Sequence, residues 1–175
     1  KVILSAGSSP MMPPIPGIEK AGFVSEFLTD RKEAGKQIVI IGGGLAGCEA
    51  ACYLKENAET VTIIEMQEDI LFGCDHCLNN DQALRQMLQD NNINKITKAT
   101  VTKIEDNRVT YLQDNQEYTI VCDTIINAAG FKPNDQLEDA LEEIYDDVTV
   151  IGDAKAPRKI LTAIHEGYHA IRVME

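Results

Sequence analysis

A glycine-rich turn constrains this 175-residue chain more than any other feature. It lies within residues 37–54, QIVIIGGGLAGCEAACYL, between four apolar residues that are typical of a buried strand and a run that is typical of a helix. Residues 60–66, TVTIIEM, supply a second candidate strand. Strand, helix and strand in this order predict a βαβ unit and place the chain in the α/β class.

The glycines of this turn have the spacing of a nucleotide cradle. Gly42, Gly44 and Gly47 match the pattern G-x-G-x-x-G between the strand and the helix. Gly42 permits the tight turn, Gly44 lets the backbone approach a pyrophosphate, and Gly47 lets the helix pack against the strand. Free N–H groups at the helix N-terminus would hold the pyrophosphate. The predicted cradle residues are Gly42, Gly43, Gly44, Leu45, Ala46 and Gly47.

Glu65 ends the second strand and selects between two cofactors. It follows Gly42 by 23 positions, close to the spacing of about 20 residues for the acid that binds a ribose. A carboxylate there accepts hydrogen bonds from a ribose 2′-OH and repels a 2′-phosphate, and the next residues, MQED, contain no Arg or Lys. We therefore expect NAD(H) rather than NADP(H). The alternative is that Glu65 is a solvated carboxylate at a strand end.

The rest of the chain extends the α/β pattern. Alternating segments separated by DN and DNQ turns predict an antiparallel meander that returns into a buried strand. The expected fold is Rossmann-like, a parallel sheet with helices plus a three-stranded antiparallel meander. The other expected elements are a strand at 1–4, a strand and turn at 148–154, helices at 25–35, 80–92 and 160–174, and the meander within 95–127.

Charge and composition exclude several classes of function. A net charge of −12 argues against binding to nucleic acid or to an anionic membrane. No stretch approaches the roughly 20 apolar residues of a membrane span. The five cysteines form no regular framework, which favours a reducing cytoplasm over secretion. Lys1 directly precedes VILSAGSSP, which is typical of the end of a buried strand, so we expect a fragment of a longer protein.

Three further stretches indicate half of a second dinucleotide site. LSAGSSP (4–10) and INAAGFKP (126–133) are similar to one another, and small residues such as Ala129 and Gly130 would let the chain pass close to a cofactor. VTVIGDA (148–154) places Gly152 and Asp153 after a strand, at the mouth of a parallel sheet where ligands bind.

The motifs SAGSSP, VIIGGGLAGCEAA, VTIIE, NAAGFKPN and VIGDA, in this order, resemble the two-dinucleotide flavoprotein reductases of the pyridine nucleotide-disulfide oxidoreductase type. In that family an NAD(P) domain is inserted into an FAD domain, whose own glycine cradle precedes the first crossover. The resemblance therefore implies that the cradle here is the nicotinamide one and that the FAD cradle lies upstream. It implies a partial FAD segment and linker at 1–34, an NAD(P)-binding domain at 35–127, and a return crossover with an FAD segment at 128–175.

The tail GDAKAPRKILTAIHEGYHA is similar to the close of old-yellow-enzyme-type NADH:flavin oxidoreductases, such as 2-enoate reductase, 2,4-dienoyl-CoA reductase and trimethylamine dehydrogenase. This resemblance implies that Asp153 contacts FAD and that Glu49 lies near the nicotinamide, unless Glu49 is an exposed helix carboxylate. It also implies an upstream TIM barrel with FMN and a 4Fe–4S cluster, which reduces an enoate- or enoyl-CoA-type substrate. No catalytic residue is assigned within the chain. The alternative is a module that binds an adenine nucleotide without hydride transfer.

Two motifs offer competing chemistry. HEGYH (165–169) matches the H-E-x-x-H pattern of zinc hydrolases, but a catalytic zinc needs a third protein ligand and only Glu175 follows as a candidate. CDHC (74–77) is a C-x-x-C without a second such pair, so we expect a loop pair of thiols. Cys48, Cys52 and Cys122 are expected to be small buried hydrophobes. We expect no metal site.

Overall fold

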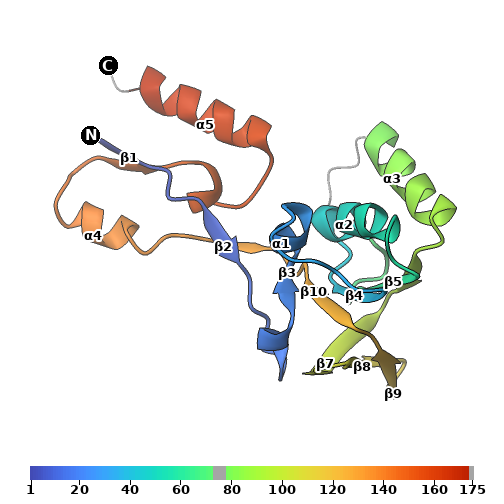
Figure 1. The fold of residues 1–175 in the computed structure, drawn as a ribbon. Coiled ribbons are helices and arrows are strands. Elements are labelled where there is room, and N and C mark those ends of the chain that lie inside the picture. Colours follow the sequence, from blue (N-terminus) through green and yellow to red (C-terminus); the bar gives the residue numbers. More distant parts are fainter. Residues whose placement is uncertain (73–77, 174–175) are drawn as a thin grey trace. The chain divides into compact units, whose positions relative to one another are not determined.

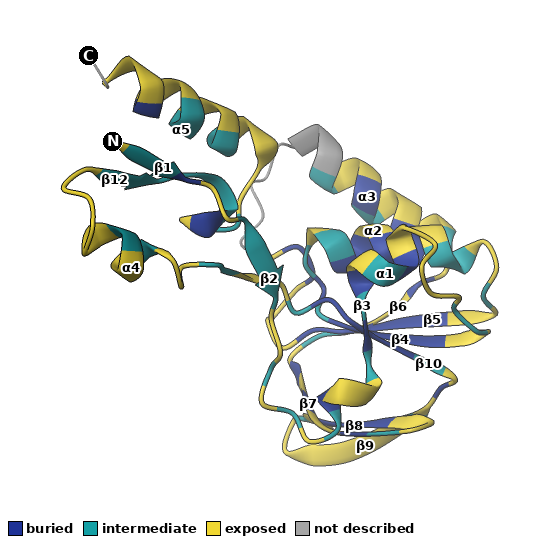
Figure 2. Cartoon of the chain, turned by 60° about the vertical axis from the view of Figure 1, so that its left-hand side comes forward, coloured by how far each residue is buried: buried dark blue, intermediate teal, exposed yellow. Residues whose placement is uncertain are grey.

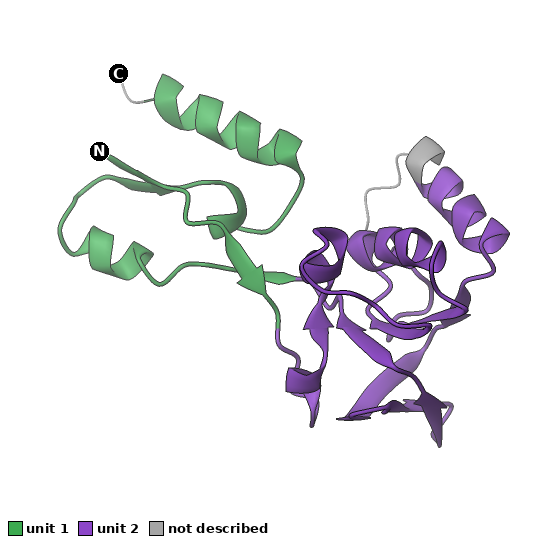
Figure 3. Cartoon of the chain, in the orientation of Figure 1, with its two compact units in different colours: residues 1–11, 131–175 green, residues 12–130 purple. Residues whose placement is uncertain are grey.

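The computed structural model describes residues 1–72 and 78–173, so the CDHC motif lies outside the described residues. The chain divides into two compact units (Figure 3): unit 1 comprises residues 1–11 and 131–175, and unit 2 comprises residues 12–130. Residues 12–34, expected to accompany the FAD segment as a linker, are thus part of unit 2. The functional division of the chain into FAD and NAD(P) segments stays a prediction.

A five-stranded parallel sheet forms the centre of unit 2 (Figure 1). Its strand order is β3 (Gly22–Phe23), β10 (Thr124–Asn127), β4 (Gln37–Ile41), β5 (Thr60–Ile64) and β6 (Asn94–Ile96). All four neighbouring pairs run parallel. Because parallel strands are usually covered on both faces, this central position explains why β4, β5 and β10 are rich in isoleucine and valine.

Helices cover one face of this sheet and an antiparallel sheet covers the other (Figure 2). Alternate strand residues, such as Ile40 and Ile63, pack with α1 (Val24–Leu28), α2 (Leu45–Lys55) and α3 (Leu78–Asp90). The intervening residues pack with the antiparallel sheet, which comprises β7 (Ala99–Glu105), β8 (Arg108–Gln113) and β9 (Gln116–Val121). The predicted α/β fold with a three-stranded meander is confirmed.

Two element boundaries in unit 2 differ from the sequence prediction. The helix expected at 25–35 ends at Leu28, and Asp30 adopts a left-handed φ of 52° that a continuing helix does not permit. The segment 95–105 is divided at Lys98, whose φ is also 52°. As a result β6 joins the parallel sheet beside β5, and the meander begins only with β7.

Unit 1 is built from four short strands and three helical elements among the described residues. β1 (Val2–Leu4) pairs in parallel with β12 (Val148–Val150), and β2 (Ser8–Pro10) pairs antiparallel with β11 (Phe131–Pro133). The helical elements of unit 1 are α4 (Glu138–Glu142), the 3₁₀ turn η2 (Gly152–Ala154) and α5 (Ile160–Arg172). Unit 2 contains a further 3₁₀ turn, η1 (Ile18–Lys20). Among the described residues, no helix is long and apolar enough to span a bilayer.

Candidate functional site

The turn between β4 and α2 folds tightly over the end of β10. Gly42 has a φ of 109°, and a Cβ added there would lie 2.5 Å from the carbonyl oxygen of Ala128. A Cβ on Gly47 would overlap the carbonyl oxygen of Gly42, so glycine is what allows α2 to approach the turn. Both positions therefore exclude larger residues because of the protein's own backbone.

Gly44, by contrast, faces open space. Apart from Gly44 itself and its two neighbours in the chain, no heavy atom lies within 4 Å of the position that its Cβ would occupy. The first backbone amide of α2 that bonds back to the turn is that of Cys48, which donates to the oxygen of Gly44 over 3.0 Å. The preceding N–H groups, at Leu45, Ala46 and Gly47, lie where a helix offers no internal acceptor. Polarised donors beside an uncovered glycine fit an anionic pyrophosphate.

Glu65 is buried against this turn, with an exposed fraction of 9%. Its Oε2 accepts a hydrogen bond of 2.6 Å from the Gly43 amide, and its Oε1 accepts one of 2.8 Å from the Gln67 amide. The solvated carboxylate considered as an alternative is therefore wrong, since this side chain links the glycine turn to the loop after β5. Sequence reasoning placed Glu65 near the cradle but gave no sign of these two bonds. Its contact with a ribose stays a prediction.

The loop after β10 lies beside the cradle, within the same unit. The Ala128 amide donates to the oxygen of Ile41 over 2.9 Å, which holds this loop against the end of β4. Asn127 is buried, and its Oδ1 accepts a hydrogen bond of 3.0 Å from the Ala129 amide. Gly130 follows with a φ of 101° and no protein atom near its Cβ position. The predicted residue Ala129 is thus brought close to Gly42, and Gly130 follows it in the chain.

The remaining predicted residue of α2, Glu49, is exposed. It lies near Cys52, whose thiol pKa is raised by burial and, to a smaller extent, by the negative charge of Glu49. Cys48, Cys52 and Cys122 are buried, as expected, and form no disulfide. Burial raises the pKa of Cys122 to about 11. These three cysteines therefore resemble core residues rather than reactive thiolates.

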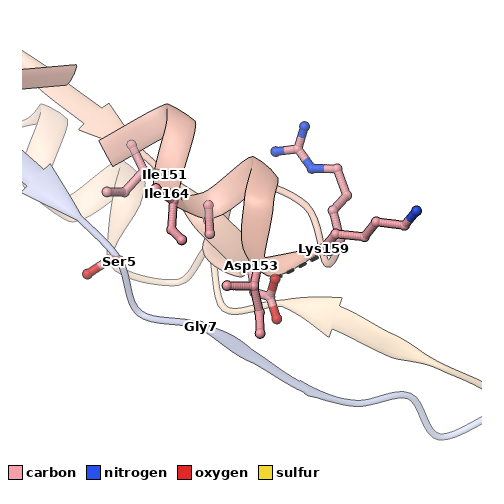
Figure 4. A pocket seen from close by; sticks show the side chains of 10 residues that line it. Ser5, Gly7, Ile151, Asp153, Lys159 and Ile164 are labelled. Carbon is pink, nitrogen blue, oxygen red and sulfur yellow. Dashed lines mark hydrogen bonds between the residues drawn. The ribbon is translucent and has the colours of Figure 1, made fainter. Parts of the chain in front are cut away.

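Unit 1 contains a separate cavity of about 520 Å³ around Gly152 and Asp153 (Figure 4). Asp153 accepts hydrogen bonds from the Ser8 hydroxyl, over 3.2 Å, and from the Arg158 amide, over 3.3 Å. Gly152 has a φ of 63°, which favours glycine. The lining residues are Ser5, Gly7, Ile151, Gly152, Asp153, Arg158, Lys159, Ile160, Ala163 and Ile164.

The HEGYH motif lies on α5, and its glutamate is occupied by other contacts. Glu166 accepts a hydrogen bond of 2.8 Å from the Gly152 amide and forms an ion pair with Arg158. The Gly152 amide, and then the charge of Arg158, hold the pKa of Glu166 below its ordinary value. His165 and His169 are exposed. Within residues 1–72 and 78–173, no three His, Cys, Asp or Glu side chains form a group that could hold a metal ion.

Comparisons with known proteins identify the family. The family "Pyridine nucleotide-disulphide oxidoreductase" matches residues 1–167. Cinnamate reductase of Clostridium sporogenes is 32% identical over 173 residues, which cover 98% of this chain and 26% of that protein. Dihydrolipoyl dehydrogenase of Acholeplasma laidlawii is 40% identical over 138 residues, which cover 76% of this chain and 40% of that protein.

A solved structure agrees with both relatives. The complex of 2-naphthoyl-CoA reductase with 2-naphthoyl-CoA superposes with a TM-score of 0.84 at 29% identity, over 95% of this chain and 26% of that one. The chain thus spans only about a quarter to two fifths of the length of these proteins. The resemblance predicted from the sequence motifs is confirmed. This chain belongs to the pyridine nucleotide-disulphide oxidoreductase family.

Proposed function

We propose that this chain is the NADH-binding module of a flavin-dependent oxidoreductase. The observation that supports the proposal most directly is the contrast among the glycines of the cradle. Gly42 and Gly47 are required by the protein's own packing, whereas no protein atom lies near the Cβ position of Gly44. A glycine that the fold itself does not require is explained if a ligand's phosphates approach the backbone there.

The residues of unit 2 would divide the nucleotide between them. The amides at the start of α2, from Gly44 to Gly47, would hold the pyrophosphate. Each carboxylate oxygen of Glu65 accepts one hydrogen bond, from the amide of Gly43 or of Gln67. A carboxylate can accept about four hydrogen bonds in all. The remaining sites would accept the ribose hydroxyls. Glu49 would lie near the nicotinamide. Residues 129–130 would lie beside the path by which the nicotinamide reaches its site.

The Asp153 cavity of unit 1 would contribute to FAD binding. Its donors and acceptors, together with apolar side chains such as Ile151 and Ile164, fit a ligand that has both a polar chain and an apolar ring. When bound, NADH would supply a hydride that FAD accepts; this chain would bind and orient NADH and would supply only part of the FAD site.

The longer protein would pass the electrons to an upstream TIM barrel with FMN and a 4Fe–4S cluster, in the cytoplasm. Its substrate would be an enoate or enoyl-CoA, and the cinnamate named for one relative is itself an enoate. If the longer protein binds NADH but its flavin is not reduced, the alternative of a nucleotide-binding module without hydride transfer replaces this proposal.

Calorimetric titration of the chain with NADH and NADPH tests the nucleotide site. We expect tighter binding of NADH, because the Glu65 carboxylate repels a 2′-phosphate. Gly44→Ala should weaken NADH binding by about tenfold or more and leave the melting temperature unchanged, since its methyl group meets only open space. Gly167→Ala on α5 is the control and should bind NADH normally. Preferential binding of NADPH, or normal binding by Gly44→Ala, would contradict the proposal.

The charge of Glu65 can be tested separately from its shape. Glu65→Gln keeps most of the side chain but removes the negative charge, so the preference for NADH over NADPH should fall by about tenfold. Glu68→Gln removes an exposed charge three residues further along and should leave the preference intact. The same titrations measure both variants. An equal loss in both would show that general charge, and not Glu65, sets the preference.

A further inference from the structure

Glu166 joins α5 to the turn that carries Asp153. Its Oε2 accepts the hydrogen bond of 2.8 Å from the Gly152 amide, and its Oε1 lies 2.5 Å from the Arg158 guanidinium. Lys155 adds a weaker ion pair at 3.9 Å. The Glu166 side chain is only 18% exposed, although it belongs to a helix whose flanking histidines are exposed. One carboxylate therefore contacts both the turn and two cations beside it.

Arg158 lies between two carboxylates. Its backbone amide donates to Oδ1 of Asp153 over 3.3 Å, while its guanidinium donates to Oε1 of Glu166 and, through Nε, to the carbonyl oxygen of Ala156 over 3.2 Å. Arg158 and Asp153 both line the cavity of about 520 Å³. If the guanidinium lost Glu166, Asp153 would be a neighbouring carboxylate with which it could pair, since the two residues already touch through the backbone. Such a pair would occupy the Asp153 carboxylate.

We propose that Glu166 is a positioning residue for the flavin side of the chain: it holds the Gly152 turn and keeps the Arg158 guanidinium away from Asp153. This inference rests on the proposed function, in which Asp153 contacts FAD. The lowered pKa of Glu166 agrees with it, because the Gly152 amide and then Arg158 favour the charged carboxylate. It also accounts for the glutamate of the HEGYH motif without a metal.

A double-mutant cycle on the flavin-containing longer protein tests the part played by Arg158. Glu166→Gln keeps an acceptor for the Gly152 amide but loses the charge that holds Arg158. It should weaken FAD binding by about tenfold, whereas in an Arg158→Gln background the same change should have less than about a twofold effect. Glu142→Gln removes an exposed carboxylate from α4 of the same unit and should leave FAD binding unchanged. Equal losses from Glu166→Gln in both backgrounds would overturn the proposal, as would normal FAD binding by Glu166→Gln.

NMR spectra of the chain itself keep this test independent of the proposed function. Glu166→Ala removes the acceptor of the Gly152 amide, which should exchange with solvent at least about tenfold faster, while Glu166→Gln should retain most of its protection. The carboxyl ¹³C signal of Asp153 should shift in Glu166→Gln and return in the double variant with Arg158→Gln. An unchanged signal would overturn the proposal. If the signals move as expected but the longer protein binds no FAD, the proposed function fails and the positioning of Asp153 stands.

Discussion

The two units of the chain differ in how completely their own residues bury a hydrophobic core. In unit 2 the central sheet is covered on both faces, and Ile40, Ile63 and Ile126 have no exposed surface. In unit 1 the buried apolar residues, among those described, are Leu4, Ala154 and Ala170. The large apolar residues of α5 remain open to solvent, with exposed fractions of 80% for Ile160 and 62% for Ile164.

This difference follows from the size of the sheets. Parallel strands are normally buried on both faces, and a sheet of two strands is marginal by itself. Unit 2 satisfies these requirements with five strands, three helices and the meander. Unit 1 has one parallel pair and one antiparallel pair. Apolar residues thus stabilise the fold in unit 2, whereas many of those in unit 1 contribute little to the stability of this chain.

The largest expected contrast is between two isoleucine truncations. Ile63→Ala in β5 should lower the free energy of unfolding by about 2–5 kcal/mol, because it leaves a cavity between the sheet and the helices. Ile164→Ala in α5 should change it by less than about 0.5 kcal/mol, because that side chain is mostly exposed. Urea denaturation followed by circular dichroism measures both. Similar losses would mean that unit 1 has a closed core after all.

A second contrast replaces one helical glycine in each unit by alanine. Gly47→Ala should destabilise the chain by about 1–3 kcal/mol or more, because the added methyl group overlaps the backbone oxygen of Gly42. Gly167→Ala meets only Ile151, at 3.8 Å, and should stabilise α5 by up to about 1 kcal/mol. Melting temperatures should therefore move in opposite directions. A fall for both variants would show that α5 is packed as tightly as α2.

The smallest expected effect concerns the pH dependence of unit 1. Because the pKa of Glu166 is lowered on folding, its contribution to stability is present above the unfolded pKa, near 4.5, and is lost as the pH falls through the folded pKa. Acidification below pH 4.5 should therefore release the Gly152 amide, which hydrogen exchange at that residue measures. Glu166→Gln should abolish this step and leave the acid response of unit 2 unchanged. A step that persists in the variant would assign it to another carboxylate.

Much of unit 2 could be predicted because its signals are local. Alternation of strand and helix patterns predicted the βαβ unit, and the spacing of Gly42, Gly44 and Gly47 predicted the turn. Family membership also followed from short motifs in order. A left-handed residue such as Lys98 was missed, because non-glycine residues carry only a weak sequence signal for positive φ. Lys98 lies at the break between β6, which joins the parallel sheet, and β7, which begins the meander.

By itself, the sequence determined the α/β class, the cradle and the order of the crossover motifs. Only the tertiary structure decided that Glu65 bonds to Gly43, 22 residues away, that Glu166 bonds to Gly152, and that residues 12–34 belong to unit 2. The physical reason is the distance along the chain over which each signal acts. Periodicity and glycine spacing act between neighbours along the chain, whereas a buried carboxylate finds its partner among whatever backbone amides the completed fold brings within about 3 Å.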